Sequence, residues 1–140
     1  MEAKESIARK LVVMKRCTDF LRANQHVSSE ELDKNYALRS AVERNFQVAI
    51  EAALDTAEVI ISEEGFEKPE DYQEAILTLG REGILPREFA ERFAPAAGFR
   101  NILVHGYAKI DIEKLHDFLQ EGPEDFDEFA RHIAKYLEKK

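Results

Sequence analysis

Residues 98–107 bring together three side chains that could act on a phosphate: Arg100, His105 and Tyr107. The planar guanidinium of Arg100 can bind a phosphate through paired N–H donors and stabilise the negative charge that develops on it. The imidazole of His105 can accept or donate a proton near neutral pH. Together the two are a minimal set for cleaving a phosphodiester without a metal ion. Tyr107 adds a hydroxyl that could hydrogen-bond the phosphate, and a ring that could stack on a base.

Arg100 and His105 are placed near the end of a predicted helix, which Gly106 is well suited to terminate. Their separation of five residues corresponds to about 140° of rotation around a helix axis, so they do not share a face of a straight helix. One helix alone therefore makes a poor active site. Two copies related by a two-fold axis would line one cleft with both pairs, which predicts a homodimer.

The elements that must position this segment are predicted to be helices joined by short breaks. Apolar residues recur at helical spacing over residues 7–21 and, in the longest stripe, over residues 38–60. Ser28 and Glu31 have the spacing of a capping box, which predicts that a further helix begins after Ser28.

Three prolines indicate where helices begin or are interrupted in the middle of the chain. Pro69 is expected in the first turn of a helix that stops at Gly83, because a missing N–H is harmless there. Pro86 opens the next helix, which leads into Arg100. Pro95 falls inside that helix, where it predicts a kink or a break.

The last part of the chain is predicted as two helices. Asp111 is expected to cap a short helix, and Gly122-Pro123 to restart another. Six glycines and four prolines in 140 residues leave little material for a turn-rich β fold. The sequence therefore predicts an all-α fold, an up-and-down bundle of five to six helices that forms a single domain over residues 1–140.

The formal net charge of −8 is unusual for a protein that binds nucleic acid, because phosphate affinity normally comes from Lys and Arg. The charge is uneven, however, since residues 86–110 carry four basic and two acidic side chains. We therefore expect a locally basic cleft on a protein whose surface is otherwise acidic.

The composition also indicates a class of protein and a compartment. Apolar runs fall short of the roughly 20 residues that span a bilayer, and the short apolar stretch at residues 11–14 is flanked by basic residues, unlike a signal peptide. Cys17 is the single cysteine and falls on an apolar helical stripe, so it is expected in the core. A cytoplasmic protein without a membrane segment is predicted.

Other candidate sites are weaker. Arg44 and Glu51 belong to a polar ridge along the long helix, which is either a solvated face or a lining of the cleft or of a dimer contact. The histidines outside the motif lack Cys or His partners at metal-ligand spacing, and the chain has neither a P-loop nor GxGxxG. No metal and no cofactor are therefore expected. Tyr72 is expected to be an ordinary half-buried aromatic.

The motif Arg100-Asn101-x3-His105-x-Tyr107 follows the apolar helix predicted to begin at Pro86. The motif and this helix together resemble those of the HepT-like toxins of the HEPN superfamily. Residues 41–55 look like the long helix of that family, and residues 68–97 are similar too, so that the resemblance extends over most of the chain. The sequence departs from the family pattern at Pro95, where a helix-compatible residue is usual.

The resemblance implies a HEPN-like helical fold and a small, metal-independent endoribonuclease. Arg100 and His105 would be the catalytic pair, in a cleft between two subunits, and Asn101 would support the site. Tyr107 would be the residue to which a nucleotidyltransferase antitoxin attaches AMP groups, which blocks the cleft. RNA, a second copy of the chain and the antitoxin are thus the expected partners.

Two alternatives to this nuclease reading stay open. The cluster could bind a nucleotide, or dock the nucleotidyltransferase, in a non-catalytic regulatory subunit, which the acidic net charge slightly favours. The chain could also be a plain helical scaffold, in which case replacing Arg100 or His105 would change only its stability.

Overall fold

The computed structural model describes residues 2–104 and 110–140, and these residues form six α-helices. They are α1 (Glu2–Ala23), α2 (Ser29–Lys34), α3 (Tyr36–Glu64), α4 (Tyr72–Arg81), α5 (Arg87–Val104) and α6 (Ile112–Glu138). Within the described ranges no helix is long and apolar enough to cross a membrane. The expected all-α bundle of five to six helices is confirmed.

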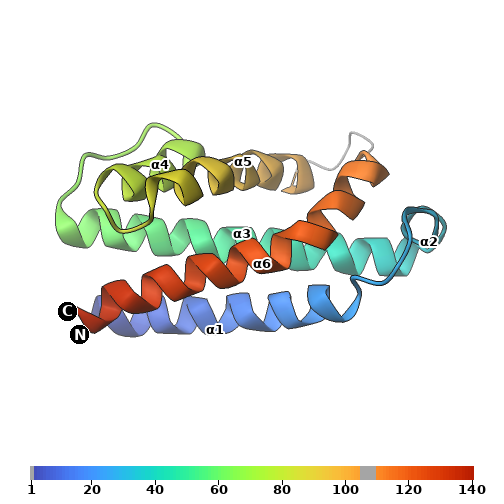
Figure 1. Ribbon diagram of the computed structural model, residues 1–140, viewed down its shortest axis with the longest axis horizontal. Coiled ribbons are helices and arrows are strands. Elements are labelled where there is room, and N and C mark those ends of the chain that lie inside the picture. The colour runs from blue at the N-terminus through green and yellow to red at the C-terminus, as the bar shows by residue number, and fades with distance from the viewer. Residues whose placement is uncertain (1, 105–109) are drawn as a thin grey trace.

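The long helix α3 is the centre of the bundle. In Figure 1 it runs horizontally, with α1 below it, α4 and α5 above it, and α6 crossing in front. Contacts join α3 to each of these helices, and α1 also packs on α6. Large side chains from several helices are fully buried between them, among them Met14, Phe46, Phe89 and Phe129. Burial of such side chains contributes roughly 1.5–3 kcal/mol each, so the core fixes the positions of all the long helices.

Most of the predicted helices are confirmed, together with the chemistry of their ends. Ser28 and Glu31 form the expected capping box at the start of α2, with both reciprocal hydrogen bonds present. Gly83 has a φ of +79° beyond the end of α4, where a residue without a side chain avoids strain. The predicted start of α4 is wrong: Asp71, not the region of Pro69, caps this helix, and its Oδ1 accepts a hydrogen bond of 2.8 Å from the Glu74 N–H.

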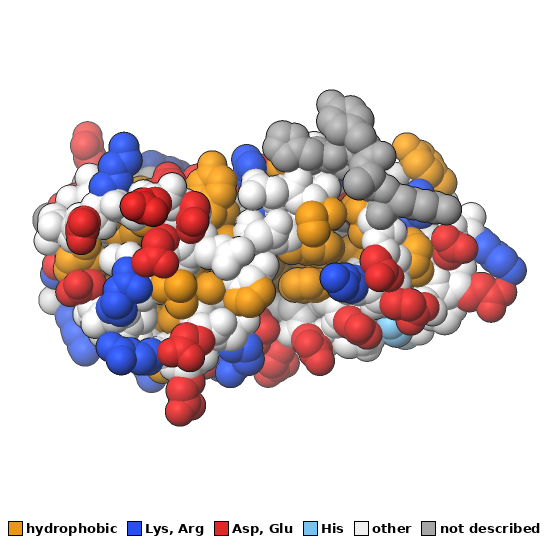
Figure 2. Space-filling view, turned by 90° about the horizontal axis from the view of Figure 1, so that it is seen from above, with side chains coloured by type: hydrophobic (Ala, Val, Ile, Leu, Met, Phe, Trp, Pro, Cys, Tyr) orange, Lys and Arg blue, Asp and Glu red, His pale blue; other side chains and the backbone are white. Residues whose placement is uncertain are grey.

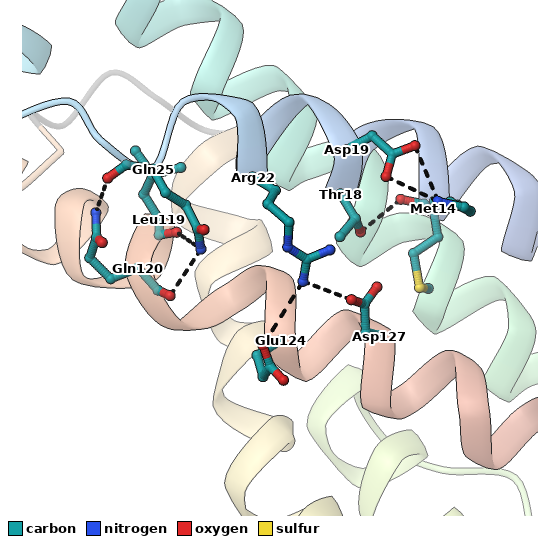
Figure 3. Close-up of polar contacts among 10 residues, drawn as sticks. Met14, Thr18, Asp19, Arg22, Gln25, Leu119, Gln120, Glu124 and Asp127 are labelled. Atoms are coloured by element: carbon teal, nitrogen blue, oxygen red, sulfur yellow. Dashed lines mark hydrogen bonds and ion pairs between the residues drawn. The ribbon is translucent and has the colours of Figure 1, made fainter.

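The predicted break at Gly122-Pro123 is also wrong, because α6 continues through both residues. Proline has no N–H, so the Leu119 carbonyl loses its intrahelical partner. The side chain of Gln25, just after α1, replaces that partner: its Nε2 donates to the carbonyl oxygens of Leu119 and Gln120, each at 3.1 Å. The Gln120 side chain donates in return to the Gln25 carbonyl oxygen at 2.8 Å, as Figure 3 shows. In Figure 1 the first turns of α6 run in a different direction from the rest of the helix.

Pro95 does not break α5 either, which is one helix from Arg87 to Val104. The residues on both sides of the proline are buried, including Phe93, Ala94, Ala96 and Ala97. Their packing in the core offsets the loss of one hydrogen bond, since tertiary contacts supply most of the stability of helices in proteins. The departure from the family pattern at Pro95 therefore leaves the helix before the motif intact.

Candidate functional site

Arg100 lies in the last turns of α5, and the core fixes the helix immediately before it. Phe99 is buried, and its ring stacks on Phe118 of α6 with a centroid separation of 4.4 Å. The ring of Phe46 from α3 meets Phe99 edge-on at 6.3 Å. Because the neighbouring residue is held by two other helices, the backbone of Arg100 has a defined position at the edge of the bundle.

Residues from two other helices contact the guanidinium of Arg100. Its Nη2 lies 3.2 Å from Oε2 of Glu51 on α3. Its Cζ lies 5.2 Å from the ring centroid of Tyr72, the first residue of α4, within the range of a cation–π interaction. Its Nη1 is 3.4 Å from Oδ1 of the adjacent Asn101, a long hydrogen bond, and the Asn101 side chain is exposed.

The Arg100 side chain is largely buried. Nε is buried and has no hydrogen-bond partner among the described residues, while the side chain as a whole is 22% exposed. A buried N–H donor without an acceptor is rare in folded proteins.

Gly98 allows the start of α4 to lie close to this part of α5. A Cβ atom at Gly98 would be 2.8 Å from Nε2 of Gln73, so the flexible end of the Gln73 side chain would have to move aside. Gln73 directly follows Tyr72 in the first turn of α4. The missing side chain at Gly98 thus leaves room for the amide of Gln73, the residue after Tyr72.

The other predicted site residues have different outcomes. His105 and Tyr107 lie outside the described residues, as does the expected helix stop at Gly106. Glu51 lies at the site through its ion pair with Arg100. Arg44, two turns earlier on α3, is exposed and pairs with no acid among the residues that the structure describes, so nothing brings it to Arg100.

Tyr72 is the site residue that sequence reasoning did not single out. Its position after the cap of a helix carries no signal of contact with Arg100, which is 28 residues further along the chain. The contact depends on the packing of α4 against α5, which helical periodicity does not predict. The Gly98 in α5 was the available hint, because a glycine within a helix often marks a close approach of another element.

The charge around the site is mixed. On the face that Figure 2 shows, acidic and basic side chains alternate over the left part, and acidic side chains predominate along the lower right edge. A groove of roughly 600 Å³ between α5 and α6 has an acidic rim of Glu121, Glu124 and Asp125, and Arg100 does not line it. Among the described residues, Arg100 is the one positively charged side chain in the last two turns of α5.

The chain is an all-α bundle with Arg100 near the end of α5, five residues before His105 and seven before Tyr107 in the sequence. A family model described as "Ribonuclease HepT-like" matches residues 13–133. The chain therefore belongs to the HepT-like ribonuclease family, and this membership confirms the family and the class of enzyme expected from the sequence.

Individual relatives agree with this assignment. A "tRNA nuclease HepT" of Aphanizomenon flos-aquae is 29% identical over 131 residues, which cover 94% of this chain and 89% of the relative. An "mRNA nuclease HepT" of Shewanella oneidensis is 23% identical, covering 88% of this chain and 92% of the relative. The tri-AMPylated HEPN toxin of Shewanella oneidensis, solved in complex with its MNT antitoxin, aligns with a TM-score of 0.83 at 22% identity, covering 93% of this chain and 97% of that one. This structural likeness confirms the expected HEPN-like fold.

Proposed function

We propose that this chain is a metal-independent endoribonuclease that cleaves RNA with Arg100 and His105, and that it is the toxin of a toxin–antitoxin pair. The observation that carries the proposal is the environment of Arg100. Its side chain is only 22% exposed, its guanidinium contacts Glu51 and Tyr72, and it lies five residues before a histidine. An arginine fixed in this way is suited to bind a phosphate and to stabilise the charge of a transition state.

The reaction needs only groups that this chain and the RNA supply. His105 accepts the proton of a ribose 2′-OH, whose oxygen attacks the adjacent phosphorus. Arg100 stabilises the additional negative charge on the non-bridging oxygens, and Asn101 supports it from the neighbouring position. The bond to the 5′-oxygen breaks, and that oxygen takes a proton from the histidine of the site. The products are a 2′,3′-cyclic phosphate and a 5′-hydroxyl end.

The proposal includes a two-fold symmetric homodimer in which each copy completes the cleft of the other. Residues 1–140 then act as one HEPN-like domain. Ile102 and Val104 are large apolar residues, 49% and 37% exposed, on the same last turns of α5 as Arg100. A second copy packed against them would cover this apolar surface and bring two motifs together. Arg44, exposed on α3, is a further candidate for the cleft or the contact.

A nucleotidyltransferase antitoxin is the proposed partner, with Tyr107 as its target. Transfer of AMP from ATP to the tyrosine oxygen would release pyrophosphate and place a phosphodiester close in sequence to Arg100. This added negative charge would pair with the arginine and exclude the phosphate of RNA. The tri-AMPylated toxin found in complex with an antitoxin supports this part of the proposal. A cytoplasmic location accompanies it, because the single cysteine, Cys17, is free and buried.

The second candidate is a non-catalytic regulatory subunit that binds a nucleotide or docks the nucleotidyltransferase. It is favoured by the net charge of −8 and by Glu51, which neutralises the charge of Arg100. Such a subunit would bind mononucleotides through Arg100 but leave RNA intact.

Cleavage of RNA in EDTA by the purified chain distinguishes the two candidates. The parent should produce cyclic-phosphate ends, while Arg100→Ala and His105→Ala should each lower the rate by at least about a hundredfold. Arg87→Ala and His26→Ala are matched controls, because both residues are exposed and lie outside the motif. Equal and negligible activity of the parent and all variants, with equal folding, would contradict the nuclease proposal.

A further inference from the structure

We infer that Glu51 and Tyr72 are positioning residues for Arg100: they fix its guanidinium in the orientation that receives the scissile phosphate before RNA binds. This inference rests on the proposed function, because it gives two further residues a role in the same site. Neither residue would touch the reacting atoms. Both would act through the orientation of Arg100.

Glu51 fixes one end of the guanidinium. The two charged side chains are only partly exposed, 22% for Arg100 and 33% for Glu51, so solvent screens this pair less than an ordinary surface pair. The carboxylate has a second contact, since Nε2 of Gln47 lies 3.5 Å from the same Oε2 atom. Gln47 and Glu51 are one turn apart on α3, the longest described helix and the centre of the bundle. The acceptor for Arg100 is thus attached to the helix at the centre of the bundle.

Tyr72 fixes the guanidinium in a second direction. An aromatic ring 5.2 Å from Cζ attracts the positive charge through its π face and limits rotation of the planar group. The backbone of Tyr72 is fixed, because it is the first residue of α4, which Asp71 caps and which packs along α5, while its side chain is 37% exposed. Glu51 on α3 contacts an edge of the guanidinium, and the ring of Tyr72 on α4 contacts its face. The two contacts therefore restrain the group in different directions.

Glu51 and Asn101 each contact one outer nitrogen of Arg100, and because each of these nitrogens carries two N–H groups, one donor on each remains for a ligand. An unrestrained arginine loses considerable side-chain entropy when it binds, and a small misplacement of a catalytic group can lower a rate by about a hundredfold. Fixing Arg100 in the free protein removes this entropy loss from the binding step. The buried Nε, which has no acceptor among the described residues, shows that the stem of the side chain is already enclosed.

The experiment compares Glu51→Gln with Tyr72→Leu, each in the full chain. Glu51→Gln keeps the size of the side chain but removes its charge, and Tyr72→Leu removes the ring. Each should lower kcat by about ten- to a hundredfold and change KM by less than about threefold. Tyr72→Phe retains the π face and should restore nearly the parental kcat. Glu43→Gln is the matched control, because Glu43 forms a comparably exposed ion pair with Arg39 elsewhere on α3.

A second readout does not depend on RNA cleavage. The Nε–Hε group of Arg100, assigned by its loss in Arg100→Lys, should give a ¹H–¹⁵N heteronuclear NOE typical of a rigid group in the parent and in Tyr72→Phe. It should give a value typical of a mobile group in Glu51→Gln and in Tyr72→Leu. If the parent failed to cleave RNA, this measurement would still decide whether the two residues hold Arg100.

Two results would overturn the inference. Unchanged kcat and an unchanged NOE in Glu51→Gln and Tyr72→Leu would show that the contacts serve only the fold. A faster reaction of Glu51→Gln would show that Glu51 competes with the phosphate for Arg100 and restrains the enzyme. Thermal unfolding of each variant separates either result from a loss of folding.

Discussion

At the scale of single residues, the environment of Arg100 illustrates how one side chain acquires a chemical role. Glu51 and Tyr72 are 49 and 28 residues away in the sequence, yet both contact its guanidinium. An exposed arginine would make only weak ion pairs with surface acids. Enclosed on two sides, Arg100 is instead a fixed positive charge at the edge of the bundle.

Tyr136 carries a prediction at the same scale. Its hydroxyl donates a hydrogen bond of 2.6 Å to Oε2 of Glu64, and Lys140 Nζ lies 2.6 Å from the same oxygen. Burial, followed by the hydrogen bond to Glu64, raises the pKa of Tyr136 above its ordinary value of 10.0. The folded chain therefore retains a proton that the unfolded chain loses above about pH 10. The free energy of unfolding should fall as the pH rises past that value.

Chemical denaturation between pH 8 and pH 11 measures this effect. The slope above pH 10 should be less steep in Tyr136→Phe than in the parent, by up to about 1.4 kcal/mol per pH unit. Tyr36→Phe is the matched control, because the Tyr36 side chain is 75% exposed. Parallel curves for the parent and Tyr136→Phe would contradict the prediction.

At the scale of elements, the continuous helix α6 shows how a tertiary contact can correct a local defect. Pro123 removes one intrahelical hydrogen bond, and Gln25, from the segment after α1, satisfies the carbonyls of Leu119 and Gln120. The α1–α6 contact continues with Arg22, whose Nη2 donates to Asp127 Oδ2 at 2.7 Å (Figure 3). The helix break predicted at Gly122-Pro123 is thus absent, because the Gln25 side chain supplies the N–H donor that Pro123 lacks.

A double-mutant cycle tests this account of α6. Gln25→Ala should lower the free energy of unfolding by about 1 kcal/mol, because it leaves two carbonyls without that donor. The loss should be smaller in a Pro123→Ala background, since the new backbone N–H at position 123 can bond the Leu119 carbonyl. Equal losses in the two backgrounds, measured by urea unfolding, would show that Gln25 does not compensate for the proline.

At the scale of the whole molecule, a protein of net charge −8 is proposed to bind a polyanion. Long-range attraction cannot drive such binding, so a local arrangement of positive groups must do so. A dimer would double the arginines in the cleft without changing the acidic surface elsewhere. This is the physical reason why the proposed activity depends on assembly.

Val104→Glu tests the role of assembly. A charge on this apolar surface should convert the proposed dimer to a monomer in sedimentation and lower RNA cleavage by at least about tenfold, although Arg100 is unchanged. Val12→Glu is the matched control, because Val12 is 60% exposed on α1, away from α5. A parent chain that sediments as a monomer at micromolar concentration while cleaving RNA would remove the composite cleft.

How much could be predicted from the sequence depended on the range of the interactions involved. The capping box of Ser28 and the stripe along α3 are local patterns with fixed spacing, and both were predicted correctly. The break expected at Pro123 was wrong, and so was the break that was one of two alternatives at Pro95, because local propensity does not include the packing and the Gln25 contact that retain these helices. Of the site, the sequence indicated Arg100 and Glu51 as candidates but could not join them.

The sequence alone determined the all-α architecture and the spacing of Arg100, Asn101, His105 and Tyr107, because helical periodicity and motif spacing are properties of neighbouring residues. Only the tertiary structure decided that α3 and the start of α4 meet the end of α5. That meeting depends on which helices share a core, and on the close approach of α4 to α5 at Gly80, where a Cβ atom would lie 2.6 Å from that of Ala90. The ion pair with Glu51 and the contact with Tyr72 follow from this packing, and they hold the guanidinium of the arginine that we propose to bind phosphate.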